Sequence, residues 1–349
     1  LAMNKARSLD EFKAAMAMQA IVSFNFVYAD AKGNVYFLHN GKIPERADGW
    51  DWRKYLPGDR SDLIWQSQIG FEDMPQITNP ASGYLLSANQ TPFNVTATAD
   101  NLRRADYAES LGFQTRMTNR ADQGLAMLAA KSRLTEADFL AVKWDKTYHP
   151  TSRARRYVNQ ISNLEFDAES PQERGQTLLN SWDGTTELDN RAAALAVCLL
   201  SAEWKAEQKG KPAPDILPVY NECLDNLQKH FGRLDPLWSQ VNRLRHGGAD
   251  LALGGGPDVL RAIYGIADPD GRLKAVAGDG LVVYSQWDKN GKQSAGMVHN
   301  FGAASTRPQS PHYADQAPLF AAETFRPVAL TRDDVLAGPH QIERLPKSR

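Results

Sequence analysis

Short apolar runs separated by turn-forming residues mark the N-terminal part of the chain. Ile21–Asp30 is rich in β-branched and aromatic residues, and Val35–His39 repeats that composition after a four-residue link that contains Gly33. Two such runs around a short glycine turn predict a β-hairpin. Before the hairpin, Ser8 and Glu11 precede residues at helical spacing, which predicts a helix that opens with a capping box.

The stretch from Asn79 to Phe93 combines a turn, an apolar run and a polar end. Asn-Pro-Ala-Ser-Gly predicts the turn, and Tyr84–Leu86 predicts a short buried strand. Asn89 then lies at the end of a rigid element, where its primary amide can donate to an oxyanion without carrying a net charge. An asparagine before Gln-Thr-Pro is also typical of a turn, so the stretch alone leaves both interpretations open.

The central part of the chain has helical periodicity. Leu102–Leu128 shows it first, and Arg116 and Arg120 are one turn apart on a shared face there, an arrangement typical of a solvated surface. Thr135 and Asp138 then predict a capped helix start. Further helices are predicted at Pro171–Trp182, Ala192–Gln208 and Pro218–Phe231.

The C-terminal part returns to strands. Gly280–Ser285 and Ala295–Phe301 are predicted strands, and Ser310–Phe325 is the last predicted helix. Glycines cluster at 247–256, but no Lys-Ser/Thr follows them, so they predict close backbone approaches rather than a phosphate loop. The order of strands, long helical part and strands predicts an α+β fold in which the terminal strands pair in one sheet.

We therefore divide the chain into three parts. Residues 1–100 form a sheet segment with the Asn89 loop, residues 101–245 a mainly helical region, and residues 246–349 the returning strands and a C-terminal helix.

Composition excludes several classes of protein. The chain has 349 residues, a net charge of −1 and 42% hydrophobic residues, as is typical of a soluble globular chain. This charge argues against a nucleic-acid partner, and the absence of an eighteen-residue apolar run argues against a membrane span. Two cysteines, Cys198 and Cys223, allow one bridge, but a pair of buried thiols is the favoured interpretation.

No complete catalytic motif is present. The chain lacks Gly-x-Ser-x-Gly, His-Glu-x-x-His and Cys-x-x-Cys, and its seven histidines are scattered. Residue patterns alone therefore indicate an α+β protein without a stated activity.

Five motifs in order resemble one known family. FNFVYADAKGNVYFLHNGKIPER, NPASGYLLSANQTPF, RLTEADF, SWDG and SPHYADQ follow one another in the chain. Together they resemble the penicillin acylase family of N-terminal-nucleophile (Ntn) hydrolases, in register from residue 1 to about 336. The stretch VNRLRHGGADLALGGGPDVLRAIYG is most similar to the branch of acyl-homoserine lactone and aculeacin acylases.

The resemblance implies a fold and a precursor. The fold is part of an αββα four-layer sandwich with a large helical insertion. Family members cleave themselves into an α chain and a β chain, whose new N-terminal serine is the nucleophile and whose α-amine, with a pKa near 7.7–8.0, is the base. Leu1 has neither hydroxyl nor thiol, and the likeness starts inside the β chain. The expected partners are thus the α chain and the N-terminal part of the β chain, which carries the serine.

The resemblance also assigns roles to single residues. Asn89 is similar to the oxyanion-hole asparagine, and Arg120 to an arginine beside the nucleophile's amine, with Arg116 as the alternative if the register shifts by one turn. Phe24 aligns with a position in the acyl pocket, although a phenylalanine in mid-strand is also typical of a core. Asp100 aligns with a calcium ligand, but one aspartate makes no site, and a helix N-cap explains it as well.

The implied activity is hydrolysis of a linear amide bond in N-acylated substrates, of the acyl-homoserine lactone or penicillin type. Catalysis needs no cofactor, and calcium would be structural. The family's usual location is the periplasm or outside the cell. The alternative is a non-catalytic relative that acts as a binding or scaffold module.

Overall fold

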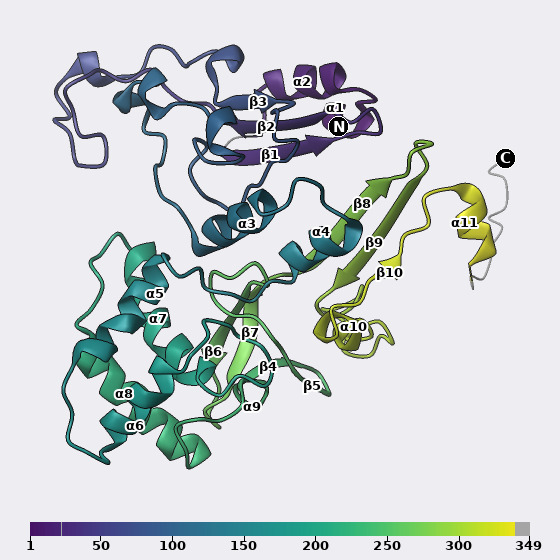
Figure 1. Ribbon diagram of the computed structural model, residues 1–349. Helices are drawn as coiled ribbons and strands as arrows, with labels where there is room; N and C mark the ends of the chain where they lie inside the picture. The colour runs from purple at the N-terminus through teal and green to yellow at the C-terminus, as the bar shows by residue number, and fades with distance from the viewer. Residues whose placement is uncertain (22, 339–349) are drawn as a thin grey trace.

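The computed structural model describes residues 1–21 and 23–338 and has mixed helices and sheets, which confirms the predicted α+β class (Figure 1). Val22, within the first predicted strand, and residues 339–349 lie outside the described parts. None of the helices in those parts has both the length and the apolar character needed to cross a membrane. The division at residues 100 and 245 stays a prediction.

The N-terminal part is a three-stranded antiparallel sheet covered by a helix. Strands β1 (Phe24–Ala29), β2 (Val35–Asn40) and β3 (Gln76–Thr78) lie in that order, with Phe24 opposite Asn40, so the predicted hairpin is confirmed. Helices α1 (Ala2–Lys5) and α2 (Leu9–Ala17) precede it, and α2 buries its apolar face against β2.

The cap of α2 follows half of the predicted box. The Ser8 hydroxyl accepts from the Glu11 N–H as expected, but the Glu11 carboxylate accepts from the N–H of Arg7 rather than from that of Ser8. The Glu11 carboxylate thus holds the backbone of Arg7, which precedes the N-cap residue.

Residues 79–118 contain less regular structure than predicted. Tyr84–Leu86 joins no strand, so the predicted strand is wrong: the Leu86 N–H bonds the Val95 carbonyl, and the Leu86 carbonyl accepts from the Gln90 side chain. The helix predicted from Leu102 begins only at Asn119, as α3 (Asn119–Ala129). Before it, short 3₁₀ turns let an aromatic cluster of Phe93, Tyr107 and Phe113 pack together.

The helical part follows the prediction more closely. Its elements are α4 (Glu136–Lys143), α5 (Arg153–Val158), α6 (Pro171–Asn180), α7 (Ala193–Gln208), α8 (Ile216–Phe231) and α9 (Trp238–Val241). Thr135 and Asp138 form the full capping box of α4. The largest core of the molecule surrounds α7, whose Ala193–Val197 turn is fully buried.

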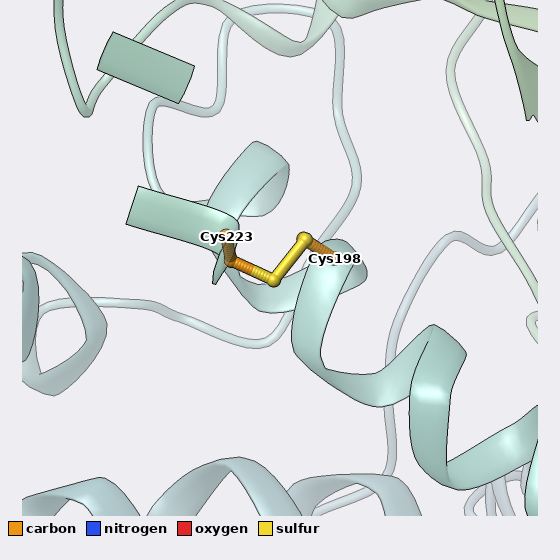
Figure 2. Close-up of a disulfide and its surroundings, with 2 residues drawn as sticks. All are labelled: Cys198 and Cys223. Atoms are coloured by element: carbon orange, nitrogen blue, oxygen red, sulfur yellow. A yellow bond between two sulfur atoms is a disulfide. The ribbon is translucent and has the colours of Figure 1, made fainter. Parts of the chain in front are cut away.

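Cys198 and Cys223 form a disulfide between α7 and α8, so the prediction of two buried thiols is wrong (Figure 2). The two helices pack with the cysteine Cα atoms 5.9 Å apart, which lies within bridging range. This pairing depends on how the helices face each other, which their separate periodicities do not determine.

The C-terminal part forms two further sheets. Their order is β5 (Ala249–Ala252), β4 (Asn242–His246), β7 (Leu273–Gly278), β6 (Ile263–Ala267) in one, and β10 (Arg326–Pro327), β9 (Gln293–His299), β8 (Leu281–Trp287) in the other. Both predicted strands correspond to β8 and β9. In the described parts, however, they do not pair with β1–β3, so the expected single sheet of terminal strands is wrong.

Strands β4–β7 and the shape of the last helix were not predicted. In β4, the charged Arg243 and Arg245 alternate with the buried Leu244. This is the period of two of a strand, but a single apolar residue between two arginines gives too weak a hydrophobic pattern to predict one. Of the helix expected at Ser310–Phe325, only α10 (Ala317–Ala321) forms, and α11 (Arg332–Ala337) follows it. The turns between 303 and 316 are held by local backbone bonds such as that from Ala304 to His312.

Candidate active site

A tightly bonded loop presents Asn89 at the surface. Its backbone is left-handed, with φ of +64°, and its side chain is exposed. The neighbouring Gln90 is fully buried and spans the loop: its Oε1 accepts from Ala88, and its Nε2 donates to the carbonyls of Leu86 and Asn94. Thr118 also donates to the Ala88 carbonyl at 3.1 Å. Asn89 is therefore exposed but held by a rigid frame.

Arg120 determines which way the Asn89 amide points. Its Nη2 donates to Asn89 Oδ1 at 3.2 Å, and its Nε donates to Asp258 Oδ1 at 3.1 Å. A guanidinium has no acceptor atom, so it bonds the oxygen of the amide and not the nitrogen. Nδ2 of Asn89 has no hydrogen-bond partner within residues 1–21 and 23–338. The structure thus brings Asn89 and Arg120 together and leaves an N–H donor free.

Asp258 is the residue of this site that the sequence did not predict. Its Oδ2 accepts from the backbone N–H of Asn119 and its carbonyl from the Asn119 side chain, both at 2.8 Å. Its own N–H donates to the Tyr264 hydroxyl at 3.3 Å, and its φ is +58°. These bonds fix the carboxylate that positions Arg120.

The sequence contains one indication that Asp258 lies at a close contact. It closely follows the glycines at 254–256, which were predicted to allow close backbone approach. Gly255 confirms that prediction, since it has φ of +91° and a Cβ there would lie 2.2 Å from the Arg261 carbonyl oxygen. The glycine loop carries Asp258 beneath the start of α3.

A cavity of about 290 Å³ adjoins Asn89 and Arg120. Its other lining residues are Arg116, Met117, Thr118, Arg153, Trp204, Glu207, Gln208, Asp258 and Tyr264. The cavity is therefore polar on the side of the arginines and aromatic on the side of Trp204 and Tyr264.

Arg116 does not share a helix face with Arg120, so that prediction is wrong. The helix begins at Asn119 because Thr118 caps it, and Arg116 lies before the cap. Its Nη1 bonds Glu207 at 2.9 Å, and Arg153 bonds the same carboxylate at 3.1 Å. Burial alone would raise the pKa of Glu207, but the bonds from both arginines lower it below its usual value. In this geometry Arg116 is paired away from Asn89.

Phe24 begins β1, and 61% of its surface is exposed. It does not line the cavity beside Asn89. Its neighbour Asn25 links β1 to the Asn89 loop, because Asn25 Nδ2 donates to Ser87 Oγ at 3.1 Å and Asn25 Oδ1 bonds His39 Nδ1 at 2.6 Å. A role of Phe24 in an acyl pocket stays a prediction.

Asp100 closes a turn and caps no helix. It ends a short 3₁₀ turn, and its Oδ2 accepts from the Ser82 N–H at 2.8 Å, which holds the turn before Tyr84. The bonds from Ser82 keep the pKa of Asp100 below its usual value. The described residues contain no group of three or more acidic, histidine or cysteine side chains suited to a metal. A calcium site needs six to eight oxygens, and a role of Asp100 as one of its ligands stays a prediction.

The sequence profile of the family described as penicillin amidase matches residues 1–337. The chain belongs to the penicillin amidase family. It is 27% identical to penicillin G acylase from Escherichia coli over 230 residues, which are 57% of this chain and 25% of that protein.

Two further relatives are more distant in sequence. The acyl-homoserine lactone acylase PvdQ from Pseudomonas syringae pv. tomato is 21% identical over 48% of this chain and 25% of its own length. The penicillin acylase 2 proenzyme of a Pseudomonas species is 24% identical over 50% of this chain and 21% of its own length. The matched part of the chain thus spans about a quarter of these relatives.

The fold comparison agrees with the family. All of this chain aligns with the structure of the thermostable penicillin G acylase from Alcaligenes faecalis, with a TM-score of 0.61 and 16% identity. The aligned part is 72% of that acylase chain. This likeness shows that the two chains share a fold.

Proposed function

We propose that this chain forms part of an enzyme that hydrolyses the amide bond of acylated substrates. Its contribution is the Asn89 amide, which stabilises the oxyanion of the tetrahedral intermediate. The single observation that carries this proposal is the bond from Arg120 Nη2 to Asn89 Oδ1, because it leaves Asn89 Nδ2 as an oriented donor beside a cavity. Preorganised donors of this kind stabilise charge that develops in the transition state.

The nucleophile of the proposed reaction is the hydroxyl of an N-terminal serine on a segment outside this chain. Its oxygen attacks the acyl carbon, and its own α-amine takes the proton. The carbonyl oxygen becomes an oxyanion that accepts from Asn89 Nδ2. The C–N bond then breaks, the leaving amine receives the proton, and water hydrolyses the acyl ester.

Arg120 has a second role in this proposal. A guanidinium near the serine's α-amine disfavours the protonated amine and so keeps the base neutral. Asp258 balances part of that charge and keeps Arg120 in place. Asp258 is thus a positioning residue.

The finer parts of the proposal rest on the relatives. One of them carries the word proenzyme in its name, which supports a precursor processed into chains. Penicillins and acyl-homoserine lactones are the proposed substrate types because they appear in the names of relatives. We further propose that the protein acts in the periplasm or outside the cell.

The test uses the complete protein that contains this chain and a chromogenic acyl amide. Asn89→Gly removes the donor and keeps the left-handed backbone, so turnover should fall by a factor of about 100–1,000 while the melting temperature stays within a few degrees. Asn89→Asp, which replaces the donor with an acceptor beside Arg120, should lose as much. Unchanged turnover in Asn89→Gly would make the oxyanion role wrong.

A binding or scaffold module is the competing function. Intact mass of the mature protein distinguishes the two, because an enzyme of this class should appear as two chains, one headed by serine or threonine. A single uncut chain without turnover would favour the module.

A further inference from the structure

A second cavity, of about 440 Å³, lies between α7, α8 and the β6–β7 edge of the four-stranded sheet. The Cys198–Cys223 disulfide links α7 to α8 (Figure 2). Both of its cysteines line the cavity. Trp204 and Tyr264 line this cavity and also the one beside Asn89. Their rings lie 4.9 Å apart, so the pair stands between the two cavities.

The interior of this cavity presents apolar surface. Val197, Leu227 and Ile263 lie in its wall. Two buried polar side chains of the wall are already bonded: Trp238 donates to the Gly255 carbonyl at 2.9 Å, and the Asn242 amide donates to the Leu253 carbonyl at 3.0 Å. The apolar wall, together with these two satisfied groups, favours an apolar chain inside the cavity.

The cavity is closed at one end and carries charged residues at its rim. At the closed end, the turn before β7 packs against α8, since Gly271 has φ of +82° and a Cβ there would lie 2.3 Å from His230. The rim also carries Lys205, in the last turn of α7, which is exposed and has no ion pair within the described residues. Asp268, the acidic residue of the rim, is paired with Arg245 at 2.6 Å. The unpaired charge at the rim is thus positive.

We propose that this cavity binds a linear aliphatic carboxylate, with the chain inside and the carboxylate at Lys205. The volume lies near the lower end of the range for small-molecule sites, which suits a small ligand with a single aliphatic chain. The site is separate from Asn89 and does not rest on the amide hydrolysis proposed above. Tyr264 connects it to the other cavity, because its hydroxyl accepts from Asp258.

The test is calorimetric titration of the complete protein with hexanoate, octanoate and decanoate. Each added methylene should tighten binding about fourfold until the cavity is full, since burying one methylene is worth about 0.8 kcal/mol. Ala267 lines the cavity and is exposed, so Ala267→Phe should fill the mouth without strain in the core and weaken decanoate binding at least about tenfold.

Matched variants show whether the carboxylate occupies this cavity and whether Lys205 holds it. Ala277→Phe changes an exposed alanine of the neighbouring strand that does not line the cavity, and it should leave binding unchanged. Lys205→Met should weaken decanoate up to about fivefold and leave 1-decanol unaffected, whereas Lys229→Met should affect neither.

Three results would overturn the proposal. Affinity that does not depend on chain length would mean that no apolar cavity is filled. Absent binding would mean that the cavity accepts no aliphatic carboxylate in the complete protein. Binding lost in Asn89→Gly but retained in Ala267→Phe would place the carboxylate in the catalytic cavity, and the hydrolase proposal would be untouched.

Discussion

Arg120 and Asp258 meet at 3.1 Å although 138 residues separate them in the sequence. The pair is largely buried, with 21% of the Arg120 side chain and 15% of the Asp258 side chain exposed. Through it, the glycine-rich loop after β5 determines how α3 presents its arginine to Asn89. The candidate site thus depends on the contact of two segments that are remote in the chain.

Removal of the Asp258 carboxylate should affect stability and activity together. Asp258→Ala leaves Arg120 and the Asn119 N–H without their partner and should cost about 2–3 kcal/mol of unfolding free energy. Asp235→Ala is the control, because Asp235 pairs with Arg233 at the surface and should cost less than about 1 kcal/mol. Urea unfolding measures both, and equal losses would contradict the role of Asp258.

Arg120→Lys should lower turnover although it keeps the charge. A lysine cannot bond Asp258 and Asn89 together in the forked geometry of a guanidinium, so the Asn89 amide loses its fixed orientation. We expect a loss of about tenfold or more in kcat with a smaller change in KM. Arg116→Lys, whose amine can still pair with Glu207, should leave kcat nearly unchanged. The opposite ranking would favour Arg116 as the catalytic arginine.

Loss of the disulfide should destabilise the helical part. The bridge joins residues 25 apart, and a loop of this length contributes about 3.5 kcal/mol in the chain-entropy account. The double variant Cys198→Ala/Cys223→Ala, or the natural chain in reductant, should therefore melt at a lower temperature. Free thiols that alkylate in the unreduced, denatured protein would show that the bridge does not form.

Gly255→Ala should be much more harmful than Gly210→Ala. Both glycines have positive φ, of +91° and +62°, but only at Gly255 would the new Cβ meet a backbone atom, at 2.2 Å. The conformational penalty should cost about 1 kcal/mol at Gly210, and the added clash should raise the cost at Gly255 to about 3 kcal/mol or more. Similar melting temperatures for the two variants would contradict the close approach beneath Asp258.

His39 should make stability fall in mild acid. Burial lowers its pKa below the ordinary value of 6.5, so the unfolded chain binds a proton that the folded chain resists. The contribution of His39 is therefore complete above the unfolded pKa and decreases as the pH falls below it. Unfolding free energies at pH 7.5 and 5 should differ less in His39→Gln than in the natural chain. The same difference in both would exclude His39 as the cause.

The sequence by itself determined the local elements and the identity of two site residues. Strong short-range signals, such as the hairpin around Gly33 and the capped helix start at Thr135, act within a few residues and formed as predicted. The resemblance singled out Asn89 and Arg120, and the structure places them in contact, while their catalytic roles stay predictions.

Only the tertiary structure decided what lies around those residues. The partner of Arg120, the start of α3 at Asn119 and the bridge between Cys198 and Cys223 all depend on contacts between distant segments. The separation of the strands into three sheets has the same origin. A period of two or 3.6 states which face of an element is buried, but not which other element covers that face.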